Sequence, residues 1–227
     1  MSAAAASDIP IVVDGSRRVS GLLLVPAKTC ACYVLAHGAG AGMRHPFMAA
    51  IAEALAARNI ATLRYQFPYM EQGSRRPDVP AVAHATVRAA VAEAARRLPD
   101  IALIAGGKSF GGRMTSQAQA SAPLPGVRGL AFLGFPLHPA GTPSDERAMH
   151  LADVQIPMLF LQGARDDLAD LALLRPLVER LGSRAKLVVF ADGDHSFHMP
   201  ARSGRKDAEV LAELAGTLAA WIEATVL

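Results

Sequence analysis

The hydrophobic positions of this chain fall into short apolar runs that alternate with longer segments of mixed polarity. The apolar runs have strand length and predict strands over Ile9–Val13, Val19–Val25, Cys30–Ala36, Ile60–Arg64, Ile101–Ala105, Arg128–Gly134, Pro157–Gln162 and Lys186–Phe190. Helical segments are expected between and after them, at Pro46–Arg58, Ala81–Leu98, Gly112–Ala118, Ala169–Leu181 and Lys206–Thr225. Tyr65–Pro80 shows no clear periodicity and is predicted to be a loop.

This alternation of strands and helices predicts an α/β fold. Right-handed crossovers would give a mostly parallel sheet with helices on both faces, which also explains strands that are apolar throughout. The first two strands are separated only by Asp14-Gly15-Ser16, which predicts an antiparallel hairpin at the sheet edge. In such a sheet, functional groups are expected at the carboxyl ends of the strands.

Length and composition narrow the class of protein. A chain of 227 residues, with 52% hydrophobic and 19% charged residues, suits one domain over residues 1–227, with residues 1–8 flexible. The net charge of +3 comes from scattered Lys and Arg without interleaved aromatics, so no nucleic-acid partner is expected. The start of the chain lacks a basic n-region, and no apolar run reaches membrane length. A cytoplasmic protein without a membrane partner is therefore predicted, as a monomer or a homodimer.

The two cysteines do not indicate a disulfide or a metal site. Cys30 and Cys32 lie at i and i+2 in a predicted strand, a spacing too local for a structural disulfide. No second cluster of Cys or His lies at ligand spacing, so neither a metal nor a cofactor is predicted.

The strongest candidate for chemistry is Gly107-Lys108-Ser109-Phe110-Gly111. It lies between a predicted strand and a predicted helix, as the G-x-S-x-G nucleophile turn requires, and Ser109 would be the nucleophile. Ala102–Ser109 also fits a relaxed phosphate-binding loop, but its middle residues belong to the apolar strand and cannot wrap an anion. A buried serine in a glycine-rich turn is the remaining alternative, and it depends on whether Ser109 has partners.

Candidate partners follow two later strands in the order Asp, then His. Asp166 comes just after the strand that ends at Gln162, and His195 comes just after the strand that ends at Phe190. Asp167 competes with Asp166, and only one of these neighbours can face the imidazole. His198 could replace His195 only if its loop folds differently. Ser109, His195 and Asp166 are therefore the predicted catalytic residues.

A negative oxygen in a tetrahedral intermediate needs two N–H donors. The amide of Phe110, directly after the nucleophile, and the amide of Ala39, in the loop after Ala36, are the candidates. Gly38–Gly42 could also be read as a dinucleotide-binding loop, but Met43 stands at the sixth position of that motif, and Arg64 rather than an acidic residue ends the next strand.

Four segments together resemble the α/β-hydrolase superfamily. They are Ala36-His37-Gly38-Ala39-Gly40, Arg64–Tyr69, Gly106–Arg113 and Asp194–Phe197. The sequence is similar to a small branch of predicted hydrolases related to dienelactone hydrolases and to hydrolase-like subunits of chromatin acetyltransferase complexes. The resemblance implies a Ser109–His195–Asp166 triad with an oxyanion hole at Ala39 and Phe110. Dienelactone hydrolases use cysteine as nucleophile, whereas serine stands here, so their substrate does not transfer.

Two functions follow from these expectations. In the first, the protein is a serine esterase, with a small-molecule ester as its substrate. No large cap domain fits between Phe135 and Ile156, so an open site is expected, walled by Tyr65, Phe67, Tyr69, Phe135 and Phe197 and suited to a short acyl or aryl ester. In the second, it is a hydrolase-like binding or scaffold protein with little turnover. An intact triad favours the esterase, although a fold alone does not establish a function.

Overall fold

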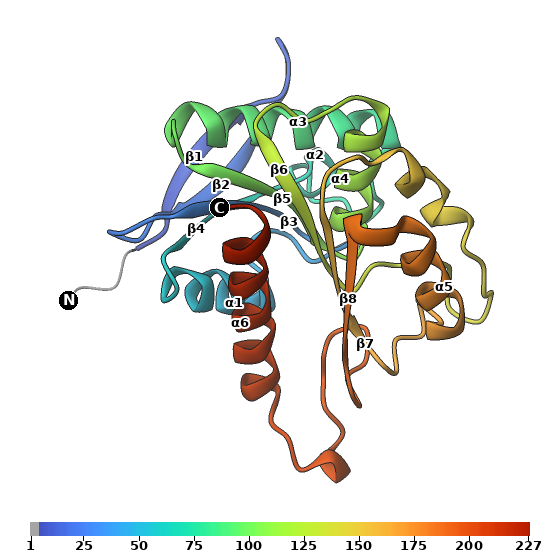
Figure 1. The fold of residues 1–227 in the computed structure, drawn as a ribbon. Helices are drawn as coiled ribbons and strands as arrows, with labels where there is room; N and C mark the ends of the chain where they lie inside the picture. The colour runs from blue at the N-terminus through green and yellow to red at the C-terminus, as the bar shows by residue number, and fades with distance from the viewer. Residues whose placement is uncertain (1–4) are drawn as a thin grey trace.

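Residues 5–227, which the computed structural model describes, contain one sheet of eight strands in the order β1-β2-β4-β3-β5-β6-β7-β8 (Figure 1). The strands are β1 (Ser7–Val12), β2 (Arg18–Leu24), β3 (Ala31–Ala36), β4 (Ile60–Tyr65), β5 (Ala102–Lys108), β6 (Val127–Leu133), β7 (Met158–Gly163) and β8 (Ala185–Phe190). All neighbouring strands from β4 through β3 to β8 run parallel. The predicted α/β-hydrolase fold with a mostly parallel sheet is therefore confirmed.

The N-terminal hairpin forms the antiparallel edge of the sheet, as predicted. β1 pairs with β2, and β2 pairs antiparallel with β4. The side chain of Asp14 makes the turn, because its Oδ1 accepts the N–H groups of Ser16 and Arg17, each at 2.9 Å. Ser7 and Asp8, expected to be flexible, instead belong to β1, where β2 supplies their hydrogen-bonding partner strand. The same expectation for residues 1–4 lies outside the described residues.

Helices cover both faces of the sheet (Figure 1). α1 and α6 pack against each other on one face, and α3, α4 and α5 lie on the other. Their bounds are α1 (Pro46–Ala56), α2 (Pro68–Glu71), α3 (Pro80–Arg97), α4 (Phe110–Ser121), α5 (Leu171–Leu181) and α6 (Asp207–Thr225). Since both faces are covered, the central parallel strands are buried along their whole length, which is why they are apolar throughout.

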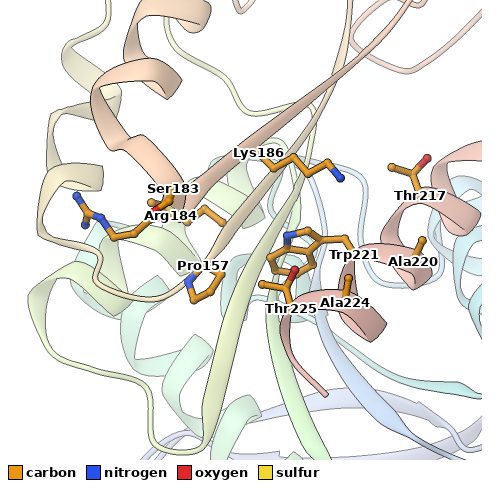
Figure 2. A pocket seen from close by; sticks show the side chains of 10 residues that line it. Pro157, Ser183, Arg184, Lys186, Thr217, Ala220, Trp221, Ala224 and Thr225 are labelled. Carbon is orange, nitrogen blue, oxygen red and sulfur yellow. The ribbon is translucent and has the colours of Figure 1, made fainter.

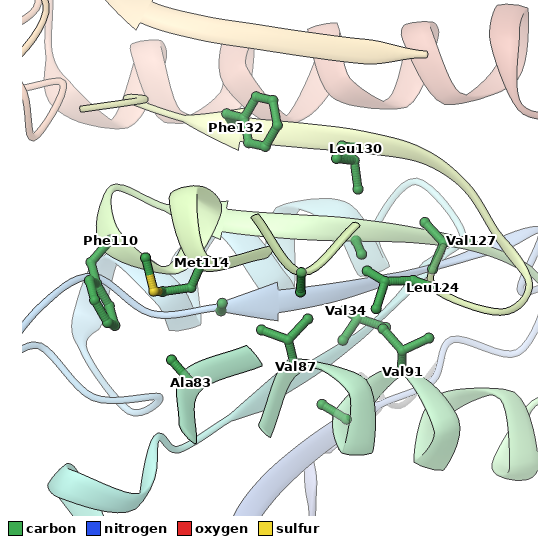
Figure 3. Packing of buried hydrophobic residues seen from close by; sticks show 14 of the residues in the cluster. Val34, Ala83, Val87, Val91, Phe110, Met114, Leu124, Val127, Leu130 and Phe132 are labelled. Carbon is green, nitrogen blue, oxygen red and sulfur yellow. The ribbon is translucent and has the colours of Figure 1, made fainter. Parts of the chain in front are cut away.

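The larger core cluster fixes the helix that follows Ser109. Figure 3 shows Ala83 and Val87 of α3 on one side of the cluster, and Phe110 and Met114 from the first turns of α4 beside them. The alanine-rich face of α3 lets this helix lie close to its neighbours, and α3 packs directly against α4. The start of α4, where the nucleophile candidate lies, is thus held by the core rather than by a surface loop.

The link between β6 and β7 is short, as the predicted absence of a large cap requires. It contains a 3-10 helix, η1 (Glu146–Asp153), which packs on α4. One polar contact at this junction joins Ser116 Oγ of α4 to His150 Nε2 of η1 at 2.8 Å. The prediction of a loop over Tyr65–Pro80 was wrong in three details: Tyr65 ends β4, Pro80 begins α3, and Pro68 begins the single turn α2, which is too short to produce a periodic pattern. No helix within residues 5–227 is both long and apolar enough to cross a membrane.

Candidate active site

Ser109 occupies the sharp turn between β5 and α4. Its backbone has φ of 49° and ψ of −117°, a left-handed conformation that costs energy for a residue with a side chain. The flanking glycines permit this turn. A Cβ on Gly107 would lie 2.2 Å from the carbonyl oxygen of Ala36, and a Cβ on Gly111 would lie 2.6 Å from Ala36 Cβ. The two glycines therefore allow β5 and α4 to pack against β3 while the Ser109 hydroxyl projects from the turn.

A continuous chain of hydrogen bonds joins Ser109, His195 and Asp166. His195 Nε2 lies 2.8 Å from Ser109 Oγ, and His195 Nδ1 lies 2.7 Å from Asp166 Oδ2. The Asp166 side chain is fully buried, whereas the His195 side chain is 24% exposed. Since a carboxylate only accepts, Nδ1 carries the proton and Nε2 is free to accept the serine proton. The structure thus brings together the three residues that the sequence analysis selected.

The two competing residues lie elsewhere. Asp167 is exposed, and its neighbour Asp166 turns inward because its Oδ1 accepts the Leu168 N–H at 2.8 Å. His198 is also exposed and pairs with Asp207 at 2.7 Å, which raises the pKa of the His198 imidazole. Neither side chain therefore takes part in the hydrogen-bonded chain.

Gln162, at the end of β7, is a site residue that the sequence analysis missed. Its Nε2 donates to Asp166 Oδ2, and its Oε1 accepts the Phe135 N–H at 2.9 Å. The side chain is fully buried, so both of its polar atoms are used where water cannot replace them. Gln162 thus fixes the carboxylate that faces His195. The only indication of this role in the sequence was that Gln162 ends a predicted strand shortly before Asp166.

A buried histidine holds the loop after β3, which carries Ala39. His37 is fully buried. Its Nε2 accepts the Phe67 N–H at 3.1 Å, and its Nδ1–H donates to the Gly38 carbonyl at 2.8 Å. Burial lowers the pKa of His37 to about 4, so the imidazole is neutral near pH 7. Within residues 5–227 the N–H groups of Ala39 and Phe110 have no hydrogen-bond acceptor. These are the two N–H groups that the sequence analysis named as oxyanion-hole candidates.

Lys108 supports the loop that carries His195. Its Nζ donates to the His195 carbonyl oxygen at 2.6 Å and lies 5.7 Å from the Phe197 ring centroid. A Cβ on Gly134 would come within 3.0 Å of the same nitrogen, so the glycine leaves room for the ammonium. Burial lowers the pKa of Lys108 to about 8, and the carboxylates of Asp166 and Asp194 only partly oppose this shift.

Two cavities meet at Ser109. One, of about 330 Å³, lies beside His195 and is lined by Ala39, His45, Phe47, Met48, Lys108, Ser109, Leu168 and Ser196, among others. The other, of about 400 Å³, lies beside Phe110 and is lined by Ala39, Pro80, Ser109, Met114, Pro136, Arg113 and Arg147, among others. We call them the His195 cavity and the Phe110 cavity. A bound molecule with its reacting atom at Ser109 could extend into both.

The five aromatic side chains predicted as the pocket wall lie in the core instead. Tyr65, Phe67 and Phe135 are 0% exposed, and Tyr69 and Phe197 are 3% exposed; none of the five lines either cavity. They pack behind the residues that line the cavities. Phe67, for example, packs edge-on against Phe110, with ring centroids 5.4 Å apart. Burial of a whole aromatic ring in the core stabilises the fold more than exposure of that ring at an open site. This difference in free energy explains why the five rings point into the core.

A further cavity, of about 380 Å³, lies at the other end of the parallel strands, away from Ser109. Pro157 and Lys186 line it at the amino ends of β7 and β8, together with Trp221 of α6 (Figure 2). Ser109, Asp166 and His195 follow the carboxyl ends of strands, so this cavity lies away from them. Among residues 5–227, no group of three or more His, Cys, Asp or Glu side chains is placed to hold a metal ion.

The fold and this site define the class of protein. Residues 29–223 match the family described as the alpha/beta hydrolase domain, and the chain therefore belongs to that family. Dienelactone hydrolase from Anabaena variabilis is 21% identical over the whole of both chains, with a TM-score of 0.79.

Two further solved structures are also similar. A serine hydrolase without a lid from Xanthomonas campestris is 20% identical, with a TM-score of 0.74, over 96% of this chain and 95% of the other. An esterase domain of a Rhodothermus marinus protein is 17% identical, with a TM-score of 0.74, over 98% and 99% of the two chains. At these identities, the three likenesses show a common fold.

Proposed function

We propose that this chain is a serine hydrolase that cleaves carboxylic esters through an acyl-enzyme intermediate. One observation carries the proposal: the unbroken hydrogen-bonded chain from Ser109 Oγ through His195 to the buried Asp166, at the meeting point of two cavities. A serine hydroxyl is a weak nucleophile, and this arrangement supplies both a base to remove its proton and a carboxylate to orient that base. The esterase and serine hydrolase named among the similar structures agree with the proposal.

Each step has a residue to perform it. Ser109 Oγ attacks the ester carbonyl carbon while His195 Nε2 takes the hydroxyl proton, and the Asp166 carboxylate stabilises the imidazolium that forms. The carbonyl oxygen becomes an oxyanion, to which the N–H groups of Ala39 and Phe110 donate. When the tetrahedral intermediate collapses, His195 gives the proton to the leaving alcohol. Water, deprotonated by His195, then attacks the acyl-enzyme, and as the second tetrahedral intermediate collapses His195 returns the proton to Ser109 Oγ and the acid is released.

Several sequence-based expectations stay predictions. These are a monomeric or homodimeric state, a single domain over residues 1–227, a cytoplasmic location and a relation to subunits of chromatin acetyltransferase complexes. The alternative of a binding or scaffold protein with little turnover is an outcome of the test that follows.

The test is labelling by a fluorophosphonate probe, with peptide mass mapping, on the wild type and on Ser109→Ala and His195→Ala. We expect labelling at Ser109 that is lost in Ser109→Ala and strongly slowed in His195→Ala, together with hydrolysis of p-nitrophenyl esters. Folded wild-type protein that neither reacts with the probe nor hydrolyses esters would overturn the enzyme proposal and favour a binding protein.

A matched pair of variants tests the acid of the triad. Asp166→Asn should lower kcat by roughly 10³- to 10⁴-fold, because the asparagine amide donates to His195 Nδ1 and favours the wrong tautomer. Asp167→Asn, one residue away and exposed, should change kcat by less than about threefold. Equal losses in the two variants would show that Asp166 is not the orienting carboxylate.

A further inference from the structure

Two arginines line the Phe110 cavity without a counter-ion. Arg113 lies in the first turns of α4 and Arg147 lies in η1, and both share this cavity with Ser109. Among the described residues, neither guanidinium has a carboxylate within ion-pair distance. The ion pairs of the described residues involve six other arginines, and the remaining arginines, like these two, form none; the six are Arg17, Arg44, Arg96, Arg97, Arg180 and Arg205. The two unpaired cations therefore line the same cavity as the candidate nucleophile.

Arg113 is partly enclosed, and its polar atoms are not fully used. Its Nε is buried and has no hydrogen-bond partner within the described part of the chain. Its Cζ lies 6.0 Å from the Phe110 ring centroid, so the guanidinium stays close to the apolar wall of the cavity. Burial lowers the pKa of Arg113, and the neighbouring charge of Arg147 lowers it further. A buried donor without an acceptor and two like charges both cost free energy in the empty site.

The groups around the two arginines do not neutralise them. Burial lowers the pKa of His150 to about 4, with smaller effects of Arg113 and His84, so His150 is neutral near pH 7 and adds no charge to the site. One carboxylate, Asp78, does line the cavity, and its Oδ2 accepts the Tyr69 N–H at 3.0 Å. With two guanidinium groups and a single carboxylate, the wall of the cavity carries a net positive charge. Planar guanidinium groups bind carboxylates through paired, charge-assisted hydrogen bonds.

The direction of the reaction decides which part of a substrate reaches these arginines. His195 gives its proton to the leaving alcohol, so the alcohol must lie on the side of His195, in the His195 cavity. The acyl substituent then extends the other way, past Ala39 and Phe110 into the Phe110 cavity. Arg113 and Arg147 thus face the acyl chain rather than the alcohol.

We propose that the ester cleaved at Ser109 carries a carboxylate at the far end of its acyl chain, and that Arg113 and Arg147 bind this carboxylate. The substrate class is therefore a half ester of a dicarboxylic acid. This inference rests on the proposed esterase function, because it names the acyl group for that reaction.

The test compares two p-nitrophenyl esters with acyl chains of equal length. The adipate half ester carries the terminal carboxylate, and the hexanoate ester does not. In the wild type, we expect kcat/KM to be at least roughly tenfold higher for the adipate half ester. Arg113→Gln and Arg147→Gln should each lower the ratio of the two kcat/KM values by roughly tenfold to a hundredfold, as expected for lost hydrogen bonds to a charged group.

Arg180→Gln is the matched control. It removes one positive charge from an exposed arginine that pairs with Asp145, so it should leave the ratio unchanged and rule out a general effect of net charge. Because Arg113 is partly buried, thermal unfolding of each variant checks that it folds. Arg147→Gln, in the surface helix η1, repeats the test at a second position. If the wild type and both arginine variants have the same ratio of kcat/KM values for the two esters, the inference is overturned, whereas the esterase proposal is unaffected.

A binding measurement separates this inference from the proposed function. Ser109→Ala cannot form an acyl-enzyme, so calorimetry with monomethyl adipate, and with dimethyl adipate as the neutral control, reports recognition alone. We expect monomethyl adipate to bind more tightly and to lose that advantage when Arg113→Gln is added. If no ester is hydrolysed but this binding is seen, the reaction is wrong and the carboxylate site stands. If the two ligands bind equally, the carboxylate site is refuted.

Discussion

Replacing Lys108 by methionine removes the ammonium group beneath His195 and keeps an unbranched side chain of similar length. In the folded chain, burial lowers the pKa of Lys108 from 10.5 to about 8. The unfolded chain therefore holds this proton more tightly than the folded chain between these two values. By linkage, the contribution of Lys108 to the free energy of unfolding must rise as the pH rises through this window.

The magnitude follows from the two pKa values. Their difference corresponds to a penalty of about 3 kcal/mol for the charged lysine, at roughly 1.4 kcal/mol per pKa unit. The penalty is fully present below about pH 8 and is largely relieved near pH 10, where the folded chain has released the proton. Lys108→Met has no ammonium at this position and carries no such penalty. The wild type should therefore gain about 2 to 3 kcal/mol relative to Lys108→Met between about pH 7 and about pH 10.

Urea unfolding of both proteins, followed by circular dichroism at several pH values, measures this gain. Taking the difference between the two proteins removes the other groups that titrate in alkali, because both chains contain them. Lys186→Met, at an exposed lysine of β8, is the control and should stay parallel to the wild type. If the curves of the wild type and Lys108→Met also remain parallel, the ammonium is not desolvated, and the account of the Lys108 site is wrong.

Two further variants test single buried contacts. Gln162→Leu removes the amide that donates to Asp166 and accepts from Phe135, so kcat for ester hydrolysis should fall by roughly tenfold; an unchanged kcat in a folded variant would show that Asp166 needs no such support. Tyr33→Phe removes a fully buried hydroxyl that donates to the Ala131 carbonyl at 2.8 Å. It should lower the free energy of unfolding by about 1 to 2 kcal/mol and leave ester turnover intact, as checked by urea unfolding and a rate assay, and a loss of turnover would contradict the structural role.

The sequence was sufficient to predict the fold, and to select three residues that the structure joins by hydrogen bonds, for one physical reason. Ser109, Asp166 and His195 each follow directly from a strand that the apolar runs had marked, and parallel strands bring their carboxyl ends to one edge. The succession of strands along the chain and the spacing of the G-x-S-x-G motif therefore determined almost entirely where these three residues would lie. The rule that adjacent side chains point apart implied that only one of Asp166 and Asp167 could face the imidazole, and the structure shows that it is Asp166.

The pocket wall could not be predicted in the same way. A ring near the end of a strand can turn toward the cavity or toward the core, and the sequence does not carry that choice. Phe67 turned inward because its N–H is held by the buried His37, a contact between residues thirty positions apart. Phe197, two residues after His195 in the chain, is buried against Phe190. In both cases burial of the ring outweighed any use of it at an open site.

The two arginines of the Phe110 cavity differ in whether their place could be predicted from the ends of the strands. Arg113 belongs to the helix that β5 positions, and its closeness to Ser109 follows from the motif itself. Arg147 lies in the link between β6 and β7, in a 3-10 helix whose place on α4 is set by contacts such as that of His150 with Ser116. No repeat or spacing joins Arg147 to Ser109. The sheet positions Ser109, His195 and Asp166, whereas the link between β6 and β7 supplies part of the positive charge of the Phe110 cavity. Sequence changes in this link would therefore alter the substrate preference and leave the reaction unchanged.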